Sequence, residues 1–330
     1  MKKCILLFIV IVISLSTKAQ KNKVYTSIDE ALLNKDSVYK LNLSEQKLQS
    51  LPKEIRLFKN LEVLNLSRNK LQKFPRALRK NKHLKELNLN FNKIYRVRFS
   101  ARKFERLEKL SMVENRINVF PNSLLGLKNL KNLNLAKNNI KKISHNIDKL
   151  NKLEVVIFYQ NKINGIPKSF YQLRQLKEFD FYYNSISTID TSIKNLKKLE
   201  RIFLSFNEIK ELPNTLCELP KLRYLYLQKN ILNSLPLCIS QLDSLKRVDI
   251  QNNEFLYFPT EILSLNNIEE IDISNNKLSS LPNELLNLKN LNLLMIRDNP
   301  LLFKGLNKDR NYSIIEALQA KKVIVKYLED

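Results

Sequence analysis

A pattern of leucine and asparagine recurs every 23 residues through most of this 330-residue sequence. One copy runs over residues 222–244, LRYLYLQKNILNSLPLCISQLDS, and each copy opens with the skeleton LxxLxLxxNxL. Twelve copies keep one register, and they start at Val38, Leu61, Leu84, Leu107, Leu130, Leu153, Leu176, Leu199, Leu222, Leu245, Ile268 and Leu291. Because no single copy can bury its own apolar side, the pattern predicts a stack in which neighbouring copies share a core.

The places within a copy, numbered from its first residue, predict a strand followed by a turn. The fourth and sixth places are always apolar, as in Leu87 and Leu89, and this alternation is typical of a strand. The ninth place is Asn in eleven copies and Gln46 in the first, and we expect this amide to bond backbone groups where the strand turns away. A proline usually stands at the fifteenth place, as at Pro236, where it ends the extended segment and opens a short helical or 3-10 turn.

This pattern closely resembles the leucine-rich repeat family in its 23-residue form, with LPxx after the Asn-containing turn. The resemblance covers residues 38 to about 302 and rests on twelve copies in register. It implies the α/β class, as a right-handed solenoid curved into an arc, with a parallel sheet on the concave side and short helical or 3-10 turns outside. We expect about twelve repeats with a cap at each end.

The segments that flank the repeats predict these caps. Residues 20–37 are interpreted as a linker and a short helix, in which Ser27 and Glu30 have the spacing of a capping box. The repeats are expected over residues 38–304, and a C-terminal cap over residues 305–330.

Within the C-terminal cap, Ser313 and Glu316 again have capping-box spacing, which predicts a helix that starts there. Residues 323–325 are Val-Ile-Val, and they predict a short strand or a continuation of the cap. Both ends of the stack are therefore expected to be covered.

The first nineteen residues have the composition of an export signal. Two lysines precede an apolar run at residues 5–15, and Ala19 stands at the small-residue position before the expected cleavage site. We therefore predict a signal peptide over residues 1–19 and an exported protein that is periplasmic, on the cell surface or secreted.

Two cysteines, Cys217 and Cys238, remain outside this leader. They lie 21 residues apart in the outer turns of adjacent repeats, and export would permit a disulfide between them. However, adjacent repeats diverge on the outside of an arc, and the two cysteines occupy different places of their repeats. The sequence therefore favours two unbonded thiols, with a disulfide as the alternative.

The chain is strongly basic, with a formal net charge of +25, and subtracting the three lysines of the leader leaves +22. Residues 68–109 hold fifteen Lys and Arg against three Glu, and the third repeat lacks the LPxx sequence. These observations indicate an anion-binding flank made by Arg96, Arg98, Arg102, Lys103 and Arg106. An anionic polysaccharide, a lipid or a membrane surface is the expected partner of such a flank, and a merely solvated basic face is the alternative. Nucleic acid is not expected, because the chain is exported and carries no recognised nucleic-acid module.

The second, third, fifth, seventh and eighth places should face solvent on the concave side. In repeats six to nine these places carry apolar and aromatic residues, whereas repeats one to five use mainly polar residues there. Since residues 23 apart lie on neighbouring strands, we expect one exposed patch made by Ile157, Tyr159, Tyr182, Tyr183, Phe203, Phe206, Tyr224 and Tyr226. Cross-strand pairing that only stabilises the sheet is the alternative.

The sequence contains no pattern that indicates catalysis or a cofactor. His83 and His145 are isolated, and metal-ligand spacing, a glycine-rich phosphate loop and a nucleophile elbow are all missing from the sequence. Asp180, Asp249 and Asp272 share the fifth place, where we expect exposed partners for neighbouring Lys and Arg.

The sequence is therefore interpreted as an exported binding protein, not an enzyme, that engages a protein or peptide through the concave patch. Anion binding by the basic flank is one alternative. A passive structural or adhesive role in the cell envelope is another.

Overall fold

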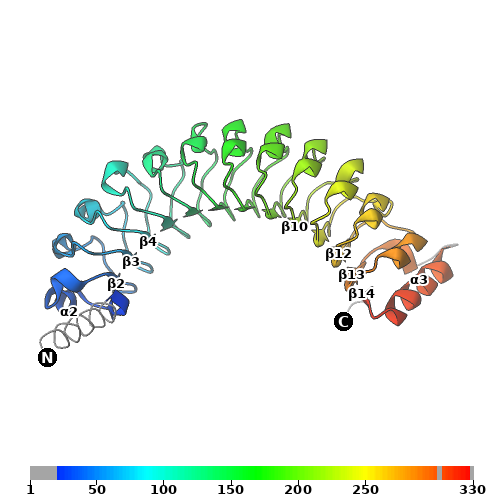
Figure 1. Cartoon of the computed structure of the whole chain (residues 1–330), viewed down its shortest axis with the longest axis horizontal. Coiled ribbons are helices and arrows are strands. Elements are labelled where there is room, and N and C mark those ends of the chain that lie inside the picture. The colour runs from blue at the N-terminus through cyan, green and yellow to red at the C-terminus, as the bar shows by residue number, and fades with distance from the viewer. Residues whose placement is uncertain (1–20, 303–306, 328–330) are drawn as a thin grey trace, which may run out of the picture. The chain divides into compact units, whose positions relative to one another are not determined.

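The computed structural model describes residues 21–302 and 307–327, so the expected signal peptide lies outside the described residues. Contacts divide the chain into two compact units, Met1–Asn139 and Ile140–Asp330, and each is described by itself. Within each unit, a parallel sheet forms one side and short 3-10 turns form the other (Figure 1). We call these two sides the strand face and the turn face.

The described part of the first unit contains a parallel sheet and the short α-helix α2 (Ile28–Leu32). Its strands, in sheet order, are β1 (Val24–Tyr25), β2 (Lys40–Asn42), β3 (Val63–Asn65), β4 (Glu86–Asn88), β5 (Lys109–Ser111) and β6 (Asn132–Asn134). Its 3-10 turns are Lys35–Ser37, Lys53–Leu57, Arg76–Lys80, Ala101–Lys103 and Asn122–Gly126. Leu64 of β3 pairs with Leu87 of β4, so residues 23 apart in sequence face each other across the sheet.

The second unit has the same construction and ends in a longer helix, α3 (Lys308–Ala320). Its strands, in sheet order, are β7 (Val155–Ile157), β8 (Glu178–Asp180), β9 (Arg201–Phe203), β10 (Tyr224–Tyr226), β11 (Arg247–Asp249), β12 (Glu270–Asp272), β13 (Leu293–Met295) and β14 (Ile324–Lys326). Its 3-10 turns are Ile147–Lys149, Lys168–Gln172, Thr191–Asn195, Asn214–Glu218, Leu237–Gln241, Thr260–Ser264, Asn283–Asn287 and Pro300–Leu302. The strands β2 to β13 belong to the twelve repeats found in the sequence.

The core of each unit consists of the apolar places of its repeats. In the ninth repeat, Leu222, Leu225, Leu227, Leu232 and Ile239 are all fully buried. Burial of one such side chain contributes about 1.5–3 kcal/mol. A strand of three residues is too short to be stable by itself, so this shared burial between neighbouring repeats holds the fold together.

The asparagine of the ninth place joins each repeat to the one before it. The Oδ1 atom of Asn230 accepts a hydrogen bond from the N–H of Ile209 at 3.0 Å, and its Nδ2 donates to the carbonyl oxygen of Leu204 at 3.0 Å. The predicted structural role of these amides is confirmed. Gln46 stands in the first repeat, which has no repeat before it, and its longer side chain donates instead to the carbonyl of Thr26 in the cap at 2.8 Å.

The predicted N-terminal helix and its cap at Ser27 are confirmed. The Oγ atom of Ser27, the N-cap residue of α2, accepts from the N–H of Glu30 at 3.1 Å. This bond satisfies a backbone donor that the start of a helix leaves unpaired. The carboxylate of Glu30 accepts from the N–H of Thr26, one residue before the N-cap, at 3.3 Å, where a full capping box would have the N–H of Ser27.

The predicted start of the C-terminal helix is wrong. α3 begins at Lys308, and Ser313 lies inside it, where its Oγ donates to the carbonyl of Asp309 at 3.0 Å. A fully buried residue, Asn311, fixes the helix to the repeats, because its Nδ2 donates to the carbonyl of Leu301 at 2.9 Å. The short strand predicted next to this helix is confirmed as β14, which pairs with β13.

Cys217 and Cys238 form a disulfide, with their Cα atoms 5.8 Å apart, which corrects the prediction of two unbonded thiols. Both lie in five-residue 3-10 turns, Asn214–Glu218 and Leu237–Gln241, of neighbouring repeats. Their Cα separation is ordinary for a disulfide. The offset of two places between them is therefore accommodated by the packing of one turn on the next.

Candidate functional site

The strand face of the second unit carries the patch that the sequence predicts on the concave side. We call this set the aromatic patch, and it consists of Ile157, Tyr159, Tyr182, Tyr183, Phe203, Phe206, Tyr224 and Tyr226 on and after strands β7 to β10. None of the eight side chains is buried, and Tyr183 is 51% exposed. The patch therefore faces water.

Four rings of the patch form a first group at the seventh and eighth places. Tyr182 lies at its centre, with its ring centroid 5.2 Å from that of Tyr159 and 5.0 Å from that of Phe206. Phe206 also stacks on Tyr183 at 5.2 Å. Such pairs contribute about 0.5–1.5 kcal/mol each beyond the area that they bury.

Phe203 and Tyr226 form a second group at the fifth place of β9 and β10. Their rings are stacked with centroids 4.7 Å apart and an angle of 4° between the planes. Tyr224 lies beside them on the same strand as Tyr226, with the guanidinium of Arg201 5.6 Å from its ring centroid. The second group is thus an apolar platform with a cationic edge.

Ile157 does not join the second group. Strand register places Asp180 opposite Ile157 on one side and opposite Phe203 on the other. The structure thus arranges the predicted single patch as two aromatic groups, with a carboxyl group between Ile157 and Phe203.

The prediction that the fifth-place aspartates are exposed is wrong. Asp249 and Asp272 are buried and Asp180 is half-buried. The Oδ1 atom of Asp180 accepts a hydrogen bond from the N–H of Tyr182 at 2.8 Å. Asn65 makes the same bond to the residue two positions further on, so this carboxyl group takes the place of a strand-ending amide.

Burial also changes the acidity of two of these carboxyls. It raises the pKa of Asp180 to about 6, although the N–H of Tyr182 opposes the rise. Burial and the neighbouring Asp272 raise the pKa of Asp249 to about 6, against the hydrogen bond from Gln251 and the charge of Arg247. The charge within the aromatic patch therefore changes near pH 6.

Two patch residues adopt a backbone conformation that disfavours aromatic side chains. The eighth place of every repeat has a positive φ, and φ is 62° at Tyr183 and 55° at Phe206. Two other repeats place Asn252 and Asn275 there, and asparagine tolerates this conformation better. Phe91 of the third repeat has the same conformation with a φ of 54°, so this strain belongs to the repeat and does not single out the patch.

The stacked pair leaves two backbone donors without an acceptor. Phe203 and Tyr226 cannot provide the fifth-place amide or carboxyl oxygen that Asp180 provides to Tyr182. Within residues 21–302 and 307–327, the N–H groups of Ser205 and Gln228 have no hydrogen-bond partner. Ser205 is buried and Gln228 is half-buried, so Gln228 is the one of these two donors that lies at the surface beside the second group of rings.

The charged side chains next to the patch are mostly paired across neighbouring strands. Lys177 lies 2.7 Å from Glu154, and Arg201 lies 3.3 Å from Glu178. Partly exposed pairs of this kind contribute only about 0–1 kcal/mol each. Their main effect is to keep the edge of the patch close to neutral.

The basic flank lies on the first unit, and all five of its predicted members are exposed. They do not form one cluster. Arg106 contacts His83, with 3.0 Å between Nη1 and Nδ1, whereas Arg98 and Lys103 line a pocket on the turn face. We call it the basic pocket, and its lining is Phe74, Pro75, Arg76, Arg79, Arg98, Phe99, Ser100, Lys103 and Phe104.

Arg76 and Arg79 line this pocket but were not among the five residues predicted for the flank. The sequence does place Arg76 one repeat, 23 residues, before Phe99, and this spacing indicates that the two residues lie on neighbouring turns. Arg96 does not line the pocket, and its backbone forms an isolated parallel β-bridge with that of Lys73.

In the described ranges, 21–302 and 307–327, no three His, Cys, Asp or Glu residues are close enough together to hold a metal ion. None of the helices described has the length and apolar character to cross a membrane.

Comparisons with known proteins agree with the repeat pattern. Two leucine-rich repeat family models match residues 36–94 and 183–232, and residues 267–288. A leucine-rich repeat protein from Leptospira interrogans is 25% identical, with 93% of this chain and 100% of that chain covered and a TM-score of 0.67. An internalin from Listeria monocytogenes is 20% identical, with 90% and 89% covered and a TM-score of 0.71.

A third solved structure is the leucine-rich repeat ectodomain of a plant membrane receptor kinase from Arabidopsis thaliana, in complex with CASPARIAN STRIP INTEGRITY FACTOR 2. It is 24% identical, with 78% of this chain and 38% of that chain covered and a TM-score of 0.50. A search of curated protein sequences gives no match. From the 23-residue register, the buried asparagine ladder and the matched segments, we conclude that this chain is built from leucine-rich repeats.

Proposed function

We propose that this protein is an exported, non-catalytic scaffold that binds a protein or peptide through the aromatic patch. The stacked pair of Phe203 and Tyr226 carries the proposal, because two rings 4.7 Å apart present a rigid apolar platform to water. Aromatic anchors of this kind supply most of the binding energy in many protein interfaces. Because the sheet already holds the rings in place, little conformational entropy is lost on binding.

One detail of the same face suits a peptide. The N–H of the half-buried Gln228, which has no hydrogen-bond partner among the described residues, can donate to a main-chain carbonyl oxygen of an extended segment.

The related structures support the kind of partner. The repeat ectodomain of the plant receptor kinase is in complex with a second factor. A leucine-rich repeat scaffold of this fold can therefore hold a partner, which we extend to this chain.

The test compares the wild-type chain with the double variant Phe203→Ala/Tyr226→Ala. Each chain is immobilised and used to capture partners from a native envelope extract, and the affinity for the captured partner is then measured by titration. Removal of two central anchors should weaken binding by about 2–4 kcal/mol. Binding should persist when salt is raised from about 0.15 M to about 0.5 M, because apolar contact is not screened.

The matched control is Tyr257→Ala, which removes a ring that is 77% exposed in the same unit but outside the patch. This variant should bind as the wild type does. If the double variant keeps the affinity of the wild type, the aromatic patch is not the binding surface.

A further inference from the structure

The third repeat departs from most of the others on its turn face. Its residues 97–100 read Val-Arg-Phe-Ser where eight repeats have an apolar residue followed by Pro. Ala101 stands at the eighteenth place, where the second repeat carries the buried Leu78. Its 3-10 turn is also shorter, with three residues at Ala101–Lys103 against five at Arg76–Lys80.

An extra phenylalanine occupies part of the space left by the small alanine. The ring of Phe99 stacks on Phe74 with 4.3 Å between centroids, and it meets Phe104 edge-on at 5.2 Å. Phe74 and Phe104 are buried, whereas Phe99 is half-buried. Phe99 therefore forms a partly exposed apolar wall on a surface that is otherwise basic.

The following repeat holds the shortened turn in place. The Oγ atom of Ser123 donates to the carbonyl of Val97 at 3.0 Å. Gly126 packs so closely that a Cβ atom on it would come 2.4 Å from the Cβ of Ala101. The wall of the pocket is thus fixed before any ligand arrives, which reduces the entropy lost on binding.

The basic pocket beside this wall has a volume of about 500 Å³. Four cations line it, and its lining contains no Asp or Glu. In the part of the chain that the structure describes, Arg76, Arg79, Arg98 and Lys103 form no salt bridge. By contrast, lysines on the strand face of the same unit are paired, as Lys85 is with Glu62 at 3.0 Å.

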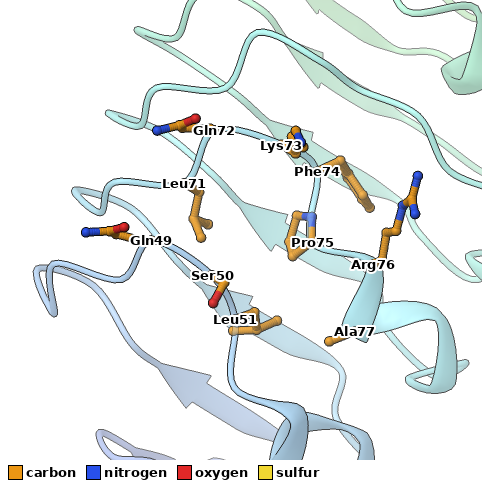
Figure 2. A pocket seen from close by; sticks show the side chains of 10 residues that line it. All are labelled: Gln49, Ser50, Leu51, Leu71, Gln72, Lys73, Phe74, Pro75, Arg76 and Ala77. Atoms are coloured by element: carbon orange, nitrogen blue, oxygen red, sulfur yellow. The ribbon is translucent and has the colours of Figure 1, made fainter.

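A second pocket, of about 460 Å³, shares Phe74, Pro75 and Arg76 with the basic pocket. Figure 2 shows this second pocket, with the amides of Gln49 and Gln72 on the side away from Arg76. The two glutamines are one repeat apart. The two pockets therefore adjoin along these three residues, and we call them together the hollow. Four cations line the basic pocket, and the second pocket adds Gln49, Gln72 and one more cation, Lys73.

The chemistry of this hollow selects a class of ligand. A guanidinium forms paired hydrogen bonds with phosphate, sulfate or carboxylate, and amide side chains both donate to and accept from hydroxyl groups. The half-buried ring of Phe99 offers an apolar surface to a flat organic group. We propose that this hollow binds an anionic saccharide, with its acidic group at Arg76, Arg79 and Arg98 and the hydroxyls of a neighbouring sugar at Gln49 and Gln72.

This assignment distinguishes a site from a diffuse basic surface. Cations spread over an outer face attract any polyanion in proportion to its charge. In this unit, however, four unpaired cations line a hollow that also has an apolar wall at Phe99 and two amides at Gln49 and Gln72. Such a hollow should distinguish an anionic sugar from an unrelated polyanion of equal charge.

Titration calorimetry with the full chain tests the proposal. The probes are a sulfated oligosaccharide, a neutral glucose oligomer of equal length, and a single-stranded oligonucleotide of equal charge. We expect the sulfated oligosaccharide to bind at least about tenfold more tightly than either of the others, which corresponds to about 1.4 kcal/mol.

Two double variants that lose equal charge locate the site. Arg76→Gln/Arg98→Gln removes two cations from the pocket, and Arg102→Gln/Arg106→Gln removes two from the same flank outside it. The first pair should weaken binding of the sulfated oligosaccharide by at least about tenfold, and the second by less than about threefold. Equal losses from both pairs, or oligonucleotide binding as tight as that of the sugar, would overturn the proposal. All four side chains are exposed, so neither pair should disturb folding.

Discussion

The fifth-place aspartates should make the stability of the repeats depend on pH, and Asp180→Asn isolates this effect. The substitution keeps the cap on the N–H of Tyr182, because Asn65 and Asn134 make the same bond at the same place in other repeats. Only the ability to ionise is lost. Asp249→Asn is the corresponding change on β11, next to the stacked pair.

The magnitude follows from the shift in acidity on folding. The pKa of Asp180 rises from an ordinary value of 3.8 to about 6 in the folded protein, because burial disfavours the charged form. The folded state therefore holds its proton up to a higher pH than the unfolded state does. The free energy of unfolding falls as pH rises from about 4 to about 6, and the full loss, about 3 kcal/mol for this carboxyl, applies above that window.

Urea unfolding of the oxidised protein at about pH 4.5 and about pH 7.5 measures the effect. At the higher pH, Asp180→Asn should raise the free energy of unfolding by up to about 3 kcal/mol, and at the lower pH by much less. Asp249→Asn should behave in the same way, because its pKa also rises to about 6.

Asp190→Asn is a control with the opposite sign. Hydrogen bonds from Ser192 lower the pKa of Asp190, so its carboxylate contributes stability that is present above the unfolded pKa and is lost as pH falls. If Asp180→Asn changes stability equally at both pH values, burial of its charge is not the cause.

Three further predictions concern the scaffold. Tyr183→Asn should change the unfolding free energy by less than about 1 kcal/mol, because relief of backbone strain offsets the lost ring contacts. Phe181→Ala, in the core, should lower the unfolding free energy by about 3–5 kcal/mol. Thermal denaturation separates them, and an equal loss from both would contradict the strain argument. Replacing Cys217 and Cys238 with Ser should cost about 2–4 kcal/mol and leave binding at the aromatic patch unchanged, as judged by denaturation and titration. Asn230→Ala should cost at least about 1–3 kcal/mol, because buried backbone groups lose their partners, and an unchanged melting temperature would refute that role.

Much of the fold could be predicted from the sequence, because residues one repeat apart in the sequence are also the residues that pair between neighbouring parallel strands. The interval between Leu64 and Leu87 is one repeat, and these residues pair across the sheet. Ser27 could be assigned because a helix cap depends on residues close in sequence. Gln46 could be recognised as an exception, although its partner in the cap could not.

Other features depend on distances and burial that a repeat pattern does not contain. The disulfide between Cys217 and Cys238 depends on how closely two outer turns pack. Residues at the fifth place were correctly expected on the strand face. That expectation does not predict that the side chain of Asp249 is buried there. The lining of the basic pocket includes Phe99 stacked on Phe74, and this contact between side chains is not contained in the repeat pattern.

The asparagine ladder also gives the stack a direction. Asn230 bonds to Ile209 and Leu204 of the repeat before it, so the acceptor and donor that it needs belong to residues nearer the N-terminus. A ribosome delivers those residues first. Every new repeat therefore meets a finished template as it emerges, and the chain can grow by addition to an ordered end during synthesis.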